Sequence, residues 1–312
     1  MPTRWSEQTG AAPGTRPLIP PAQTGPGGPQ PPPWDVDELI RVRDRIASFG
    51  LNPSSAELPV SGPITLGLPA RDRDIESVLA CIESAGKVGL KVLTYNFTAL
   101  RASEGYDARW GAGRGGADHR DFDHERIRGL PPLDSVGKHT SEEMWERLAW
   151  FLERVIPFAE SAGVRRAVHP NDPPVAEYRG VAQPLHRLAE WTRLIDTVDS
   201  PANCLFFDTG VTTELGEDPV EVIRYFGSRD RIGTVHFRNV HVEKPIYRYV
   251  ETFIDEGDCD MPACMKALHE VGYRGGVDPD HTPGITDDTP DTRIGWAYAI
   301  GQMTAMRNSV TA

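Results

Sequence analysis

The stretch Thr234-Val-His236-Phe-Arg238-Asn239-Val240 decides how the fold of this 312-residue chain is interpreted. Its apolar part, residues 233–237, has the length of a buried parallel strand, and polar side chains follow directly where the strand ends. Residues 167–172, 204–210 and 275–281 repeat this arrangement. The four segments place at strand ends the residues His169, Asp208, His236 and Asp280. Because parallel strands end at a common edge of a sheet, these side chains are expected to form a divalent-metal site.

Strand and helix patterns alternate along the chain, which predicts an α/β fold with a parallel sheet covered by helices. Strands are expected at residues 54–60, 90–97, 164–168, 204–207, 233–237 and 275–278. Helices are expected at residues 34–49, 71–88, 140–162, 184–198, 218–226, 261–271 and 292–306. Thr140 and Glu143 form a capping-box pattern at the start of the third helix. Six strands are two short of an eight-stranded barrel, so the fold class is predicted to be a TIM-type (β/α) barrel that is irregular or incomplete at its N-terminal strands.

Two segments do not fit this alternation. Residues 1–33 are rich in Pro and Gly and bury little apolar surface, so an irregular arm is expected there. That arm either supplies two poor strands or leaves the barrel incomplete, and residues 34–312 are expected to form a single barrel domain. Residues 100–138 are a polar, Gly-rich connection that is too long for an ordinary loop. We expect this connection to be a lid or to be partly disordered.

Composition excludes several classes of protein. The net charge of -12 disfavours a surface for nucleic-acid phosphates. No apolar run reaches membrane-spanning length, and residues 1–23 lack the apolar core of a secretory signal. The 4 cysteines show no CxxC spacing, which favours a reduced, cytoplasmic protein. The expected partner is a small molecule, with no nucleic acid and no membrane.

The residues beside the four strand ends suggest further roles. Arg238 could hold a substrate carboxylate through two parallel hydrogen bonds, and its alternative role is a surface ion pair. His281 adjoins Asp280 and points elsewhere along an extended chain, so it could act as a general acid or base beside the metal. The alternative for His281 is an ordinary surface histidine. Mixed imidazole and carboxylate ligands suit Mn²⁺, Mg²⁺, Fe²⁺ or Zn²⁺ without choosing among them.

Six motifs, in this order along the chain, resemble the mannonate dehydratase family of xylose-isomerase-like barrels: Tyr95-Asn96-Phe97, His169-Pro-Asn-Asp-Pro-Pro174, Thr209-Gly210, His236-Phe-Arg-Asn-Val240, Asp260-Met261 and Pro279-Asp280-His281. The resemblance implies metal ligands at His169, His236 and Asp280, a catalytic histidine at His281, and a homodimer or higher homo-oligomer. The family's fourth ligand, a cysteine, falls on Asp208. A carboxylate in place of a thiolate favours Mn²⁺ or Mg²⁺. The family's catalytic tyrosine has no counterpart in residues 282–293.

The expected function is that of a lyase, a metal-dependent dehydratase that converts an aldonate into a 2-keto-3-deoxy sugar acid. Mn²⁺ is the expected cofactor. Beside the four ligands, catalysis is assigned to His281, Arg238 and Tyr95, and substrate binding to Asn96, Arg238, Asn239 and Asp172. One alternative is a metal-dependent isomerase or epimerase of the same superfamily, which the carboxylate of Asp208 favours. A second alternative is a binding homologue without catalysis, which the missing tyrosine favours.

Overall fold

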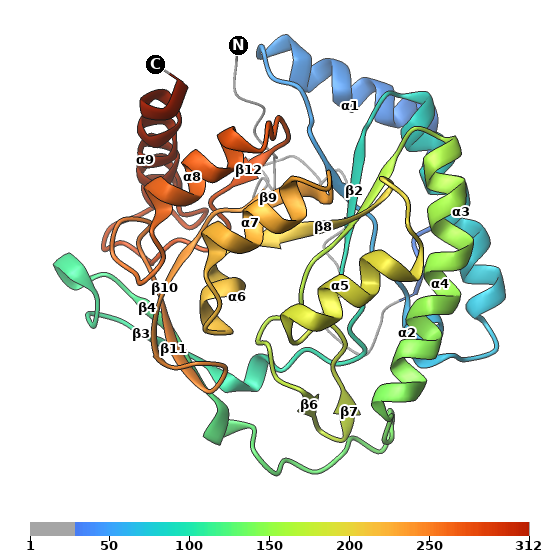
Figure 1. The fold of residues 1–312 in the computed structure, drawn as a ribbon, viewed down its shortest axis with the longest axis horizontal. Coiled ribbons are helices and arrows are strands. Elements are labelled where there is room, and N and C mark those ends of the chain that lie inside the picture. The colour runs from blue at the N-terminus through green and yellow to red at the C-terminus, as the bar shows by residue number, and fades with distance from the viewer. Residues whose placement is uncertain (1–28, 312) are drawn as a thin grey trace.

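A computed structural model describes residues 29–311 of the chain. Its central feature is a six-stranded sheet with the spatial order β1-β2-β5-β8-β9-β12 (Figure 1). The strands are β1 (Ala56–Glu57), β2 (Val92–Tyr95), β5 (Arg165–Val168), β8 (Asn203–Asp208), β9 (Ile232–His236) and β12 (Val277–Asp278). Every neighbouring pair is parallel, so all six strands end at one edge of the sheet. The six strands predicted from the sequence therefore all form, close to the predicted positions.

The sheet is a curled half-barrel in the part of the chain that the structure describes, with β1 and β12 as its edges. The curl brings the two edges close at their N-terminal ends. A Cβ built on Gly276, just before β12, would lie only 2.6 Å from Oγ of Ser54, just before β1. Most of the expected N-terminal arm, residues 1–28, lies outside the described residues, and residues 29–35 contain no helix or strand. A barrel that is incomplete at its N-terminal strands agrees with this sheet.

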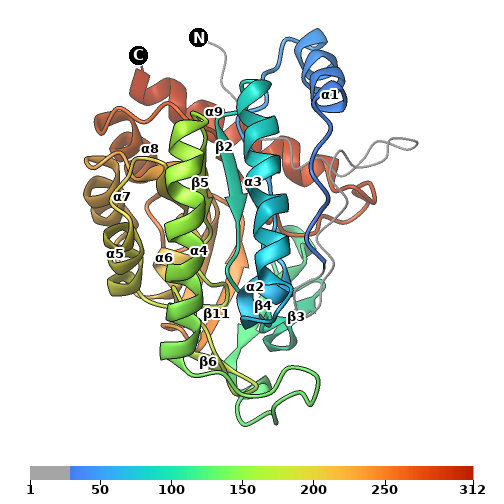
Figure 2. The same cartoon turned by 90° about the vertical axis from the view of Figure 1, so that its right-hand side faces the viewer.

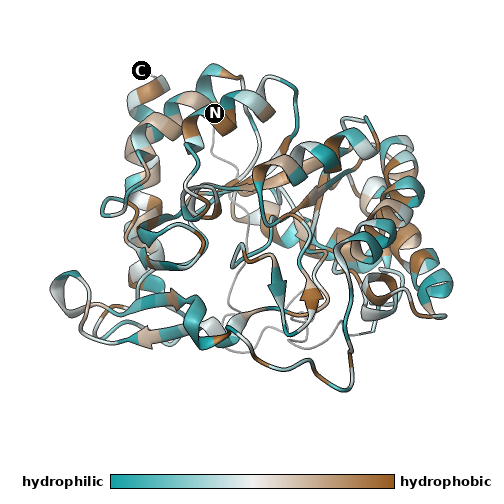
Figure 3. Cartoon of the chain, turned by 60° about the horizontal axis from the view of Figure 1, so that its bottom comes forward, coloured by the Kyte–Doolittle hydropathy of each residue, from teal (hydrophilic) through white to brown (hydrophobic). Residues whose placement is uncertain are grey.

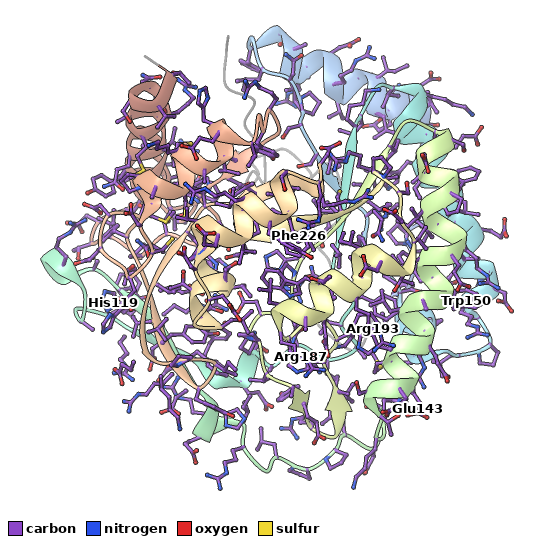
Figure 4. All side chains as sticks on the ribbon, in the orientation of Figure 1. His119, Glu143, Trp150, Arg187, Arg193 and Phe226 are labelled. Atoms are coloured by element: carbon purple, nitrogen blue, oxygen red, sulfur yellow. The ribbon has the colours of Figure 1, made fainter. Side chains whose placement is uncertain are left out.

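Helices cover the outer face of the sheet. They are α1 (Val36–Ser48), α3 (Arg71–Lys87), α4 (Ser141–Ser161), α5 (Leu188–Thr197), α7 (Pro219–Gly227), α8 (Met261–Glu270) and α9 (Arg293–Thr311). Figure 2 shows α3 and α4 side by side in front of β2 and β5. The predicted capping box begins α4, at the end of the helix where Figure 4 labels Glu143. Oγ1 of Thr140 accepts from the Glu143 amide at 3.2 Å, and the Glu143 carboxylate accepts from the Thr140 amide at 2.7 Å. Among the described helices, none is long and apolar enough to span a membrane.

Two layers of apolar side chains lie on the two faces of the curled sheet. The larger one packs between the strands and the helices and includes Tyr95, Phe151 and Phe207. The smaller one fills the inside of the curl and consists of Val92, Ala167, Cys204 and Phe206. Side chains alternate between the two faces along a strand, so each strand position is assigned to one layer. This alternation decides which strand-end residues can reach the site.

A second sheet was not predicted. It is antiparallel, has the order β10-β11-β4-β3, and extends away from the helices (Figure 3). Its strands are β3 (Tyr106–Arg109), β4 (His119–Asp123), β10 (Asn239–Lys244) and β11 (Arg248–Thr252). Residues 100–138 are therefore not a structureless loop. These strands were not predicted from the sequence because they are short and β3 is mostly exposed, so they show little apolar alternation. Other short elements were missed as well: α2 (Gly62–Leu66), α6 (Thr209–Glu214), β6 (Glu177–Tyr178) and β7 (Val181–Ala182).

Candidate active site

Three of the predicted ligands meet where β5, β8 and β9 end. Nε2 of His169 lies 3.2 Å from Oδ2 of Asp208 and 3.0 Å from Nδ1 of His236. Nδ1 of His236 lies 3.4 Å from the same oxygen of Asp208. All three side chains are largely buried. The structure thus brings together residues that are far apart in the sequence.

The donor chemistry of these atoms fits a shared cation. Nδ1 of His169 lies 2.6 Å from the carbonyl oxygen of Pro170 and donates to it, so Nε2 presents a lone pair to the cluster. The oxygen of an ionised Asp208 is also an acceptor. Two ligand atoms bound about 2.1 Å from one cation are about 3.0 to 3.4 Å apart at octahedral or tetrahedral angles. The observed separations fall in this range.

The fourth predicted ligand, Asp280, lies at the border of the cluster. Its Oδ2 is 3.5 Å from Nδ1 of His236 and 3.3 Å from Nε of Arg238. Asp280 adopts a φ of 54°, which is uncommon outside glycine. This backbone turn lets the neighbouring side chains of Asp280 and His281 approach to 3.6 Å instead of pointing to opposite sides. All four predicted ligands are therefore at one end of the sheet.

Arg238 is buried and binds several carboxylates of the protein, an arrangement called the Arg238 hub below, so it is not accessible to hold a substrate carboxylate. Its side chain is 1% exposed, and its guanidinium donates to Asp208 at 3.0 Å through Nε, to Glu214 at 2.8 Å through Nη1 and to Asp172 at 3.1 Å through Nη2. Burial would raise the pKa of Asp208, but the charge of Arg238 and the hydrogen bonds to His169 and His236 together outweigh it and hold that pKa well below its usual range. With its donors engaged in this way, Arg238 does not have the geometry expected of a clamp for a substrate carboxylate. The sequence could not reveal this, because the carboxylates come from separate segments.

Gly210 allows this hub to form. A Cβ on Gly210 would lie 2.7 Å from Cζ and 2.8 Å from Nη1 of Arg238, whose position is fixed by its carboxylate partners. We expect Gly210→Ala to lower the free energy of unfolding by about 1 to 3 kcal/mol in chemical denaturation, because the guanidinium must move. Gly301→Ala is the control, since a Cβ there meets nothing within 4 Å on an exposed face of α9, and it should be neutral or slightly stabilising. Equal stability of the two variants would show that the guanidinium is not held in place.

His281 lies beside a cavity of about 330 Å³ next to the ligand cluster. Its Nδ1 is 3.0 Å from Oε1 of Glu251 and 2.8 Å from Nη1 of Arg120, and its side chain is 41% exposed. Partial burial would lower the pKa of His281, but the carboxylates of Asp280 and Glu251 outweigh it and raise that pKa to about 9. A histidine that carries a proton and faces a cavity has the properties of a general acid.

Two of the predicted residues, Tyr95 and Asn239, lie away from the cluster, and Asn96 makes no polar contact with it within residues 29–311. The Tyr95 ring lies 5.4 Å from that of Phe151 on α4, in the layer between the sheet and the helices, and its hydroxyl has no partner among residues 29–311. Asn239 donates to the carbonyls of Ile254 and Cys259 and so holds the loop after β11. Asn96 is half-buried and makes no side-chain hydrogen bond within the described chain. The Tyr95 side chain points away from the cluster because side chains alternate along β2 and its neighbours in the strand face the inside of the curl.

Several residues of the site were not found from the sequence. The hydroxyl of Tyr106 hydrogen-bonds to Asp172 and lies 2.6 Å from the hydroxyl of Tyr249. Glu251 accepts from Arg120 at 2.6 Å and from His281 at 3.0 Å. Tyr106, Arg120, Tyr249 and Glu251 lie on the antiparallel sheet. Because β4 pairs with β11, which lies more than a hundred residues further along the chain, no local signal in the sequence points to them.

Comparison with known proteins identifies the family. The family model for D-mannonate dehydratase (UxuA) matches residues 22–132 and 123–311. A mannonate dehydratase of Thermotoga petrophila is 31% identical over 285 residues, which is 80% of this chain and 78% of that protein. The crystal structure of mannonate dehydratase from Streptococcus suis serotype 2 matches with a TM-score of 0.76 at 25% identity, over 89% of this chain and 84% of that one. An L-ribulose 3-epimerase shares the fold, with a TM-score of 0.56 at 16% identity over 89% of this chain and 81% of that one. The resemblance found in the sequence motifs is thus confirmed, and the chain belongs to the mannonate dehydratase family.

Proposed function

We propose that this protein is a metal-dependent dehydratase that removes water from an aldonate, with D-mannonate as the first candidate, and releases a 2-keto-3-deoxy sugar acid. The observation that carries the proposal is the meeting of His169, Asp208 and His236 within 3.4 Å of one another at the sheet edge, beside His281. Membership of the mannonate dehydratase family supports the same reaction, that of a hydro-lyase.

A divalent cation would be held by His169, Asp208 and His236, with Asp280 as the fourth ligand. When bound, such an ion acts as a Lewis acid that stabilises negative charge on the substrate and polarises the departing hydroxyl. The two carboxylates make this donor set harder than one containing a thiolate, so Mn²⁺ is the proposed metal and Mg²⁺ the next candidate. Arg238 fixes the orientation of Asp208 through the bond from Nε at 3.0 Å.

The protein side chains would move the protons. In the reaction the proton on C2 and the hydroxyl on C3 leave as water, and the resulting enol becomes the 2-keto-3-deoxy acid. His281 is the proposed proton carrier, because it borders the cavity and Glu251 orients its Nδ1 at 3.0 Å. Asp118 and Arg120, which belong to the segment proposed as a lid, line the same cavity. We therefore propose that residues 100–138 form a wall of the substrate site.

Incubation with D-mannonate and Mn²⁺ is the direct test of this function. We expect a 2-keto-3-deoxy acid, detected by periodate and thiobarbiturate or by mass spectrometry as a loss of one water. A chelator should stop the reaction, and added Mn²⁺ should restore it. If none of a panel of six-carbon aldonates loses water in the presence of Mn²⁺, the dehydratase assignment is wrong.

An isomerase or epimerase is the second candidate. The observation that favours it is the carboxylate of Asp208 at the position where the family resemblance implies a cysteine ligand. Such an enzyme would exchange a carbon-bound hydrogen of a free sugar with solvent and release no water. Recovery of a sugar that has gained deuterium from D₂O, without any keto-deoxy product, would select this candidate.

Location and assembly are proposed on other grounds. The described chain contains four buried cysteines that form no disulfide: Cys81, Cys204, Cys259 and Cys264. This fits a reducing compartment such as the cytoplasm.

The family resemblance implies a homodimer or a higher homo-oligomer. Light scattering coupled to size exclusion measures the mass in solution and would contradict this proposal by giving the mass of a single chain.

A further inference from the structure

We propose that Arg120, on β4, binds the carboxylate group of the substrate and so selects sugar acids over neutral sugars. This inference rests on the proposed function, and it concerns a residue that the sequence did not single out. It replaces the role that the sequence suggested for Arg238.

The cavity beside His281 is also lined by Asp280, which borders the ligand cluster, so a substrate in this cavity lies near both the cluster and the proton carrier. Its lining includes Asp280, His281 and Arg120, together with Thr282, Thr292 and Trp296. Its volume, about 330 Å³, is within the range of small-molecule sites. Hydroxyl groups and an indole ring are suitable contacts for the hydroxyls and the C–H groups of a sugar.

The charges around the cavity favour one end for an anionic group, where Nη1 of Arg120 lies 2.8 Å from Nδ1 of His281. Asp118, Glu251 and Asp280 line the cavity and would repel a carboxylate. Arg120 is the one lysine or arginine among the described residues that line it. A substrate carboxylate placed anywhere else in this cavity would therefore be desolvated next to like charge without a guanidinium partner.

Arg120 has donors to spare, whereas Arg238 has none in a position to reach a ligand. Arg120 is 37% exposed, and its Nη1 is the atom that meets both Glu251 and His281. Within residues 29–311, its Nε and Nη2 have no hydrogen-bond partner. The guanidinium also lies over the Tyr106 ring, with Cζ 3.8 Å from the ring centroid, which fixes its plane. A planar, held guanidinium with two free donors matches a carboxylate in two-bond geometry.

The position of Arg120 also suits the reaction. Its Nη1 is 2.8 Å from Nδ1 of His281, so a carboxylate bound to Arg120 brings the adjacent C2 and C3 near the imidazole. Arg120 would thus bind the acid group and place the C3 hydroxyl, which leaves as water, near the proton carrier. Neutral sugars would lose this anchor and bind weakly.

The test compares the binding of an acid with that of its neutral analogue. Calorimetric titrations of Mn²⁺-loaded His281→Asn protein, which should hold the acid unreacted, use D-mannonate and the alditol D-mannitol. In this background we expect Arg120→Met to weaken mannonate binding by about 10- to 100-fold and to change mannitol binding by less than about 2-fold. Arg120→Lys keeps the charge but loses the planar pair of donors, so its mannonate affinity should fall between those of the proteins with Arg120 and with Arg120→Met. Arg114→Met is the matched control, because Arg114 lines the neighbouring cavity and pairs with Asp255 at 2.9 Å.

A second measurement needs no variant. Phenylglyoxal modifies accessible guanidinium groups, and peptide mass spectrometry of the Mn²⁺-loaded wild-type protein reads each site. Mannonate should protect Arg120 and not Arg114, and mannitol should protect neither. Unchanged mannonate affinity in Arg120→Met, equal losses for acid and alditol, or no protection by any six-carbon aldonate would each overturn the inference. Protection of Arg120 by an aldonate that is never dehydrated would instead overturn the proposed function and leave the inference standing.

Discussion

Asp208→Ala is expected to remove the bound metal and to lower the rate of mannonate dehydration by more than about 10³-fold. Asp208 supplies the oxygen that lies within 3.4 Å of both imidazoles, so its loss breaks the cluster at its centre. The measurements are metal content by inductively coupled plasma mass spectrometry after gel filtration and the yield of keto-deoxy acid. A protein that keeps one metal per chain and its full rate without this carboxylate would place the active centre elsewhere.

Controls for this variant must separate chemistry from folding. Asp208 also caps α6, since its Oδ1 accepts from the Val211 amide at 2.8 Å. Asp208→Asn keeps that cap and removes the charge, so it should fold and still lose the metal. Asp196→Ala, at an exposed position on α5, should change neither metal content nor rate. Asp208→Cys restores a thiolate ligand and is expected to shift the metal preference from Mn²⁺ toward Zn²⁺.

His281→Asn should lower kcat by about 10²- to 10⁴-fold while the metal content stays unchanged. The reason is that His281 borders the cavity and carries the transferable proton, whereas the imidazoles of the ligand cluster are His169 and His236. Stopped-flow or discontinuous assays of keto-deoxy acid give kcat, and metal analysis of the same sample shows whether the ligand cluster is intact.

The matched control for this variant is His241→Asn. His241 is an exposed histidine on β10 that pairs with Asp258 at 3.0 Å, outside the cavity. This replacement should leave kcat unchanged. A His281→Asn protein that dehydrates mannonate at the wild-type rate would remove His281 from the mechanism and return the search to the tyrosines Tyr106 and Tyr249.

The parallel sheet and the meeting of His169, Asp208 and His236 were predictable because their signal is local. A short apolar run followed by His or Asp is visible in a few residues, as at His236 and Asp208, and parallel strands deliver their ends to one edge. Tyr95 shows where this reasoning was incomplete. A residue at a strand end belongs to the site only if its side chain is also on the inner face of the sheet. The alternation along β2 puts Tyr95 on the outer face.

The antiparallel sheet and the carboxylate network were not predictable from the chain. β4 pairs with β11, so Arg120 reaches Glu251 across 131 positions of sequence. β3 is largely exposed and carries no alternating apolar pattern. The carboxylate partners of Arg238 come from different elements. The local sequence around each of them predicts only an acidic residue at the surface. Long-range pairing of polar residues leaves no periodicity for a sequence pattern to reveal.

The carboxylates around Arg238 have a consequence for the sign of the charge that this site can accept. Five lie within ion-pairing distance of it: Asp172, Asp208, Glu214, Glu251 and Asp280. Burial raises the pKa of Glu214 well above its usual value. The pKa values of the other four are lowered, mainly by Arg238 for Asp172 and Asp208 and mainly by histidines for Glu251 and Asp280. These carboxylates outnumber the two guanidinium groups and the protonated imidazole of His281 that oppose them. The buried excess of negative charge thus favours a cation at the ligand cluster and disfavours an anion there.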